Sequence, residues 1–257
     1  MSLNERQEAV LELVRSQGFA SVEALSERFD VTAQTIRRDI NNLAAMGFVT
    51  RYHGGAGAPS SAENLAYSAR QVLHLEAKQR IAALVADYLP DHASLFINLG
   101  TTTEEVAKAL SRRRGLRVIT NNLNVATVMG RNPDTEVIVA GGVVRARDLG
   151  VTGEATIDFV RLFRVDFGIV GISSVEPDGT LRDFDYREVR VSEAIIAQSR
   201  EVLLVADHSK FGRNALVRLG HLSQVHALFT DRPPPPAMQP VIAEAGARLY
   251  VPDQQVE

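Results

Sequence analysis

The chain has 257 residues, 45% of them hydrophobic, which is too long for one small domain and apolar enough for a sizeable packed core. It contains no cysteine, so a disulfide framework and a thiolate metal site are excluded, and its formal net charge of −3 excludes a protein that holds nucleic acid by overall charge alone. No apolar run reaches the length of a signal peptide or a membrane span, so we expect a cytoplasmic protein with no membrane partner.

Two amphipathic helices are predicted at the start of the chain. Residues 4–17 place apolar side chains at helical spacing, and Gly18 provides a C-terminal stop. Residues 21–29 repeat the pattern. Only Asp30 and Val31 separate this second helix from a third, so the sequence predicts two short helices joined by a tight turn.

The third predicted helix follows Thr32, which is placed to cap it, and has two faces. Ile36, Ile40 and Leu43 fall at helical spacing on the inward face. The outward positions near its start carry residue types that contact base edges and phosphates: Gln34, Thr35, Arg37 and Arg38. An ordinary solvated helix pair would show the same pattern. From residue 31 to 58, however, three arginines stand against one aspartate, which favours a helix-turn-helix on DNA.

The stretch after the third helix predicts a small hairpin, or wing. Residues 48–53 are strand-like and run into two glycines. Arg51 and His53 could contact the DNA backbone or minor groove, and a surface histidine in a turn is an equal alternative for His53. The small residues at 54–61 are expected to mark the domain boundary. We therefore predict a DNA-binding domain over residues 1–57, a linker over 58–74 and an effector domain over 75–257.

Apolar strands alternate with amphipathic helices in the larger part, which predicts an α/β domain with a mostly parallel sheet covered by helices. The expected strands cover residues 94–99, 116–120, 136–140, 165–170, 201–206, 226–230 and 248–251. The expected helices cover residues 75–88, 103–110, 124–129, 155–162, 186–199 and 237–245.

Four of these strands end in residues suited to a ligand, and the carboxyl ends of parallel strands are where such sheets bind ligands. The candidate residues are Gly100, Thr101, Thr102 and Thr103 for an anion at a helix start, Asn121 and Asn122 for hydroxyls, Gly141 and Gly142 for close backbone approach, and Asp207 and Lys210 for charge. Each set alone could serve helix capping or turn formation. Together they favour a small phosphorylated polyol.

Other polar residues give weaker signals. His208 has no second histidine or cysteine at ligand spacing, so we expect no metal site and no cofactor. The acidic cluster of Asp183, Asp185 and Glu188 fits either a solvated face or a group that orients ligand hydroxyls. Both interpretations stay open at the level of sequence.

Six motifs, in order along nearly the whole chain, resemble the DeoR-type repressors of sugar catabolism. They lie at residues 35–40, 53–56, 100–102, 120–123, 140–142 and 207–212. Asn98, where the family commonly has aspartate, and Ala77, which interrupts a usual Glu-Lys pair, depart from the pattern. The resemblance implies a winged helix, an effector domain similar to ribose-5-phosphate isomerase, and a homo-oligomer, dimer or tetramer, on operator DNA.

The resemblance also implies that a phosphorylated metabolite releases the DNA. Within the family, residues 95–97, 184–186 and 210–215 point to sn-glycerol 3-phosphate, and a sugar phosphate is the alternative. The rival expectation is a sugar-phosphate isomerase. Such isomerases carry a carboxylate pair after the strand that here ends at Ser174, and no acid stands there, so we expect no catalytic residues and no enzyme.

Overall fold

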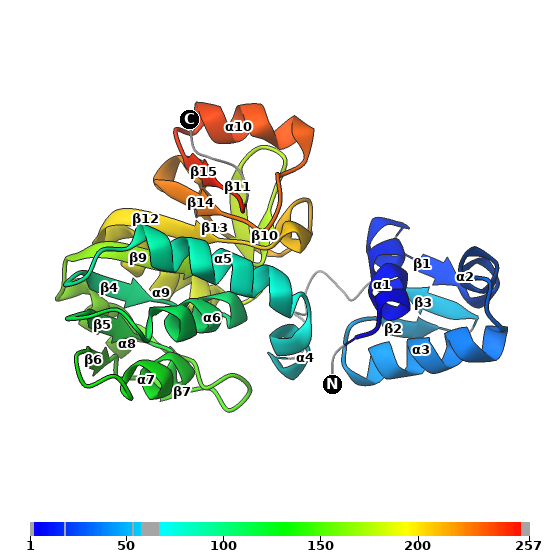
Figure 1. Ribbon diagram of the computed structural model, residues 1–257, viewed down its shortest axis with the longest axis horizontal. Helices are drawn as coiled ribbons and strands as arrows, with labels where there is room; N and C mark the ends of the chain where they lie inside the picture. The colour runs from blue at the N-terminus through cyan, green and yellow to red at the C-terminus, as the bar shows by residue number, and fades with distance from the viewer. Residues whose placement is uncertain (1–2, 18, 53, 58–66, 253–257) are drawn as a thin grey trace. The chain divides into compact units, whose positions relative to one another are not determined.

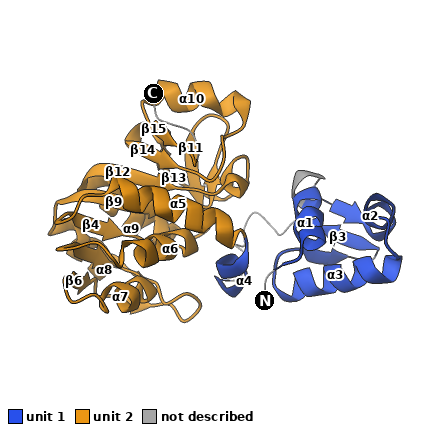
Figure 2. Cartoon of the chain, viewed as in Figure 1, with its two compact units in different colours: residues 1–73 blue, residues 74–257 orange. Residues whose placement is uncertain are grey.

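The computed structural model describes residues 3–17, 19–52, 54–57 and 67–252. They form two compact units, residues 1–73 and 74–257, shown in different colours in Figure 2. The helix α4 (Tyr67–Val72) lies within the stretch expected to be a linker and belongs to the first unit. Its Ala69 is buried, as is Leu73 directly after it.

The first unit contains the three predicted helices, α1 (Glu5–Gln17), α2 (Val22–Phe29) and α3 (Ala33–Ala45). Two polar side chains cap the helix pair, because Ser21 Oγ accepts from the Ala24 N–H at 3.1 Å and Thr32 Oγ1 from the Thr35 N–H at 3.2 Å. The inward residues expected on α3 are buried. The helix-turn-helix predicted from spacing is therefore confirmed as a structure.

A three-stranded antiparallel sheet completes this unit, in the order β1 (Phe19–Ser21), β3 (Gly55–Gly57), β2 (Thr50–Tyr52). The hairpin β2–β3 confirms the predicted wing as a local structure. The small-residue stretch expected at the domain boundary includes Gly55–Gly57, which is the central strand of this sheet and lies inside the predicted DNA-binding domain of residues 1–57. A side chain at position 55 would lie 2.4 Å from the Ala20 carbonyl oxygen and from the Phe19 ring, so only glycine allows this close pairing.

The second unit is built on a seven-stranded sheet whose strands are all parallel (Figure 1). The order across the sheet is β15 (Arg248–Tyr250), β14 (Ala227–Phe229), β12 (Ser199–Val205), β9 (Val165–Gly171), β4 (Ser94–Ile97), β5 (Arg117–Thr120), β6 (Glu136–Val139). All seven predicted strands are thus confirmed. Their carboxyl ends meet at one edge of the sheet, which brings the candidate ligand residues to that edge.

Helices cover both faces of this sheet, which confirms the predicted α/β class. The helices α5 (Leu75–Tyr88), α6 (Thr101–Leu110) and α7 (Leu123–Met129) share one apolar core. The helices α8 (Glu154–Arg161), α9 (Tyr186–Ala197) and α10 (Gln239–Glu244) share the other. Along β4, Leu95 and Ile97 belong to the first core and Phe96 to the second, as strand alternation requires.

Several short elements escaped prediction. A hairpin of β7 (Val143–Val144) and β8 (Val151–Thr152) follows β6. A second antiparallel sheet joins β10 (Ser174–Val175), β11 (Thr180–Asp183) and β13 (Val217–His221). Single 3-10 turns occupy η1 (His208–Lys210), η2 (Leu222–Gln224) and η3 (Pro236–Met238). No helix in the described part of the chain is both long and apolar enough to span a bilayer.

Candidate functional site

The outward face of α3 carries the predicted DNA-contacting side chains. Gln34, Arg37 and Arg38 are exposed, and Thr35 is half-buried. Thr35 Oγ1 lies 2.9 Å from Thr32 Oγ1, so this hydroxyl is shared with the helix cap. The geometry leaves two guanidinium groups and one amide available on a single helix face, which is the arrangement a major-groove helix needs.

Asp39, the acid on α3, adds no negative charge to the outward face of this helix. Its side chain is 5% exposed and accepts from Arg6 Nε at 2.7 Å and from Gln7 Nε2 at 3.0 Å, both on α1. Its charge is therefore neutralised on the inner side of the helix, where it fixes α3 against α1. The exposed face of α3 keeps only basic charge.

The hairpin β2–β3 presents Arg51 and Tyr52 to solvent. The Tyr52 ring packs edge-on against Phe19 with centroids 6.2 Å apart. Arg51 thus stands on a supported strand, as a backbone-contacting arginine would. His53 lies outside the described residues.

The first candidate ligand group is the start of α6. Gly100 caps this helix with φ 143°, a conformation that favours glycine, and α6 begins at Thr101, two residues earlier than predicted. Thr103 Oγ1 lies 2.8 Å from the Asn98 carbonyl oxygen and 2.7 Å from that of Gly100, so its hydroxyl fastens the turn. The backbone N–H groups of the first helical turn are the part of this motif suited to an anion.

The two amides after β5 play different roles. Asn122 Oδ1 accepts from the Asn124 N–H at 2.9 Å and caps α7, and its Nδ2 donates to Glu104 at 3.0 Å, so this side chain is structural. Asn121 Nδ2 donates to the Val151 carbonyl oxygen at 3.1 Å. Asn121 is 1% exposed, and its Oδ1 has no hydrogen-bond partner among the described residues.

Of the two glycines after β6, Gly142 is required by packing, whereas a Cβ at Gly141 would meet nothing within 4 Å. Gly142 has φ 148°, and a Cβ there would lie 2.2 Å from Thr156 Oγ1 and 2.9 Å from the Thr152 carbonyl oxygen. Gly141 accepts from Thr156 Oγ1 at 2.8 Å through its carbonyl. Glycine at position 142 is thus required by the close approach of β8 and α8, and the role predicted for the two glycines at a ligand stays a prediction.

A charged group lies beyond β12. Asp207 is buried, accepts from the Ser209 N–H at 2.9 Å, and lies 3.9 Å from Lys210 Nζ. Burial by itself would raise the pKa of Asp207, but the charge of Lys210 and the Ser209 hydroxyl, with His74 and Lys78 nearby, hold that pKa well below its usual value. This carboxylate therefore stays ionised beside the strand ends.

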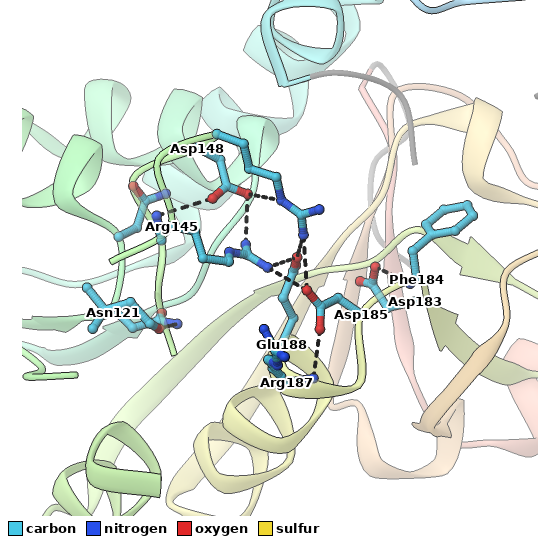
Figure 3. A network of polar contacts seen from close by, with 12 residues as sticks. Asn121, Arg145, Asp148, Asp183, Phe184, Asp185, Arg187 and Glu188 are labelled. Atoms are coloured by element: carbon cyan, nitrogen blue, oxygen red, sulfur yellow. Dashed lines mark hydrogen bonds and ion pairs between the residues drawn. The ribbon is translucent and has the colours of Figure 1, made fainter. Parts of the chain in front are cut away.

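The acidic cluster proves to be an anchor for the β7–β8 hairpin (Figure 3). Arg145 pairs with Asp148 at 2.7 Å, with Asp185 at 3.1 Å and with Glu188, and Arg147 reaches Asp185 at 3.1 Å and Glu188 at 3.0 Å. Burial would lower the pKa of Arg145, but these carboxylates hold it above its usual value. Asp183 instead accepts from Ser173 Oγ at 2.8 Å. Asp185 and Glu188 are thus neutralised by arginines.

The arginine pair was missed because nothing local in the sequence links Arg145 and Arg147 to Asp185, which lies 40 and 38 residues later. Lys78 was missed as well, although it occupies an inward position on α5 and is 3% exposed. A lysine at a buried helical position is the signal that could have identified it.

Two protein-family models match the chain, one over most of each unit. The model of the DeoR-like helix-turn-helix domain matches residues 6–62, and that of the DeoR C terminal sensor domain matches residues 73–232. Ribose 5 phosphate isomerase A from Neisseria gonorrhoeae is similar with a TM-score of 0.39 and 15% identity over 52% of each chain.

Two curated relatives span nearly the full length. The glycerol-3-phosphate regulon repressor of Escherichia coli (strain K12) is 50% identical over 249 residues, 97% of this chain and 99% of that protein. The protein of the same name from Haemophilus influenzae is 50% identical over 91% of each chain. The chain therefore belongs to the DeoR family, with the helix-turn-helix domain in its first unit and the sensor domain in its second.

Proposed function

We propose that this protein is a sequence-specific DNA-binding repressor of a carbon-catabolism regulon, and that a small phosphorylated polyol, sn-glycerol 3-phosphate, releases it from its operator. The observation that carries the proposal is 50% identity, over almost the whole length, to a repressor named for the glycerol-3-phosphate regulon. The exposed arginines of α3 and the wing supply the DNA-binding half of this function.

The ligand half is supported by the carboxyl edge of the sheet. The start of α6 offers backbone N–H groups to a phosphate, and Lys210 adds positive charge. A doubly charged phosphate on a short polyol matches such a site. Gly100, Thr101 and Thr102 surround the anion in this proposal, while Asn121 faces the polyol.

A regulator fits this chain better than an isomerase. No acid follows β9 before Glu176, so proton transfer has no base at the position where such an enzyme needs one. The 50%-identical relatives are likewise named as repressors. A homo-oligomer that binds two operator half-sites about 34–36 Å apart completes the proposal.

The DNA-binding half is tested by Arg37→Ala and Arg38→Ala in the full chain. A base-contacting arginine contributes roughly 1–3 kcal/mol, so at least one variant should lose about 5–150-fold in operator affinity and tolerate changes at one base position. Arg51→Ala should weaken all DNA sequences more evenly. Fluorescence anisotropy with operator and scrambled DNA measures both effects. Unchanged operator affinity in both helix variants would disprove the role of α3.

A further inference from the structure

Asn98 follows β4 at the carboxyl edge of the sheet and is 3% exposed. Its Nδ2 donates to Ser192 Oγ on α9 at 2.7 Å. Ser192 Oγ in turn donates its single proton to the Glu188 carbonyl oxygen at 2.9 Å. Because the serine proton is used there, Ser192 must accept from Asn98, and the orientation of the Asn98 amide is fixed.

The fixed amide leaves Asn98 Oδ1 buried, with no hydrogen-bond partner in the described part of the chain. Asn121 has the same property for an independent reason. Its Nδ2 donates at 3.1 Å to the Val151 carbonyl oxygen, which can only accept, so Oδ1 must point elsewhere and is also buried without a described partner. A buried acceptor without a donor is destabilising, and proteins rarely keep one without a reason.

The two amide oxygens belong to neighbouring positions. Ile97 on β4 pairs with Thr120 on β5, so Asn98 and Asn121 directly follow paired residues. The two strands are adjacent and parallel, and such strands lie about 4.8 Å apart. By strand alternation, both share the sheet face of Phe96 and Ile119, which pack in the core of α8 and α9. Asn98 lies shortly before α6 and Asn121 shortly before α7. Both are therefore at the carboxyl edge of the sheet, where the ligand is proposed to bind.

We propose that Asn98 Oδ1 and Asn121 Oδ1 accept hydrogen bonds from two hydroxyl groups of the phosphorylated ligand and so set its specificity for a polyol. This inference rests on the proposed function. The ligand hydroxyls supply the donors that the fold withholds from these oxygens. A phosphate ester without hydroxyls would leave both acceptors unpaired and should bind more weakly for that reason. Asn98 thereby becomes a specificity-determining residue of the sensor domain.

The test compares sn-glycerol 3-phosphate with n-propyl phosphate, which has the same carbon chain but neither hydroxyl. Isothermal titration with the full chain should give at least about a tenfold preference for glycerol 3-phosphate. Asn98→Leu and Asn121→Leu, close in size to asparagine, should each reduce that preference by about fivefold or more. Affinity for n-propyl phosphate should stay within about twofold, which a general structural defect would not allow.

Two further variants sharpen the result. Asn98→Asp keeps an acceptor at this position and should retain the preference for the polyol. Thr135→Val removes another oxygen without a described partner, ahead of β6 at the opposite edge of the sheet, and should change nothing. If a leucine variant fails to fold, Asn98→Ala and Asn121→Ala give the same ratio.

The outcomes separate the two proposals. Leucine or alanine variants that keep the full preference overturn the assignment of these amides and leave the repressor function untouched. A natural chain that binds both esters equally overturns hydroxyl recognition while supporting a phosphate site. If the natural chain binds none of glycerol 3-phosphate, fructose 1-phosphate and n-propyl phosphate, both this inference and the ligand proposed for the repressor are overturned.

Discussion

Tyr88 illustrates how single residues hold the second unit together at the amino edge of its sheet. Its hydroxyl donates to Glu201 at 2.7 Å and accepts from Arg248 at 2.7 Å. Its ring meets Phe229 and Tyr250 edge-on with centroids 5.5 and 5.3 Å away. Burial, with the hydrogen bond to Glu201, raises the pKa of Tyr88 to about 12.

We predict that Tyr88 ionises at a pH well above the ordinary tyrosine pKa of about 10. Because its pKa is raised on folding, its contribution to stability is full below the ordinary pKa of about 10 and is lost as pH rises through about 12. We would titrate both the natural chain and Tyr88→Phe with base and subtract their phenolate absorbances. The difference should show one transition near pH 12. Glu201→Gln should move that transition to lower pH. Ionisation of Tyr88 at the ordinary tyrosine pKa of about 10 would contradict the assignment.

The β7–β8 hairpin is held in place by ion pairs. It has only two residues in each strand, too few to hold a fixed position through backbone pairing alone. Arg145, whose side chain is 11% exposed, fastens it to Asp185 and Glu188 at the start of α9. Arg147 makes contacts with the same acids, but its side chain is 56% exposed.

Replacing these arginines should therefore have unequal effects. Arg145→Met leaves three carboxylates around an uncharged side chain and should cost about 3 kcal/mol of local stability. Arg147→Met removes a solvent-screened pair and should cost less than about 1 kcal/mol. Hydrogen exchange of the amides in residues 143–152 measures both. If these amides are equally protected from exchange in the two variants, the burial of Arg145 does not strengthen its hold on the hairpin.

Elements with a clear period were predictable, and those defined by long-range pairing were not. The seven parallel strands are buried apolar runs between helical patterns, which sequence reveals directly. The strands β10 and β11 contain no continuous apolar run, and β11 pairs with β13 over 30 residues later. Gly55–Gly57 resembled a linker because glycine is rare in strands. Only the nearby Ala20 carbonyl oxygen and Phe19 ring explain it.

The sequence predicts where the candidate ligand residues gather, but not which of their side chains are free to contact a ligand. Parallel strand ends gather at one edge whatever the side chains do, so sequence alone predicted that the candidate residues lie at this edge. Whether a polar group there faces a ligand depends on its other partners. Thr103 and Asn122 are occupied by local hydrogen bonds. The sequence marked Asn98 only as a departure from the family pattern, and the orientation of its amide is fixed by its bond to Ser192, 94 residues away.

At the scale of the whole molecule, we predict that DNA binding needs both units. A chain ending after Leu73 keeps the helix-turn-helix, the wing and α4, but loses the proposed oligomerisation domain. Because two linked half-site contacts reinforce each other, residues 1–73 alone should bind operator about 100-fold or more weakly than the full chain. Circular dichroism checks that the fragment folds, and anisotropy measures its binding. A folded fragment with full operator affinity would contradict a role for the second unit.

The central claim is that glycerol 3-phosphate releases this protein from DNA, and operator binding titrated with that ligand tests it most directly. Release requires the ligand to bind the DNA-free state more tightly than the DNA-bound state. We expect saturating glycerol 3-phosphate to weaken operator binding by roughly 5–150-fold, while glycerol and a pentose phosphate have little effect. Release by the pentose phosphate instead would keep the repressor and change its ligand. Operator affinity that glycerol 3-phosphate alters no more than glycerol does would contradict the account.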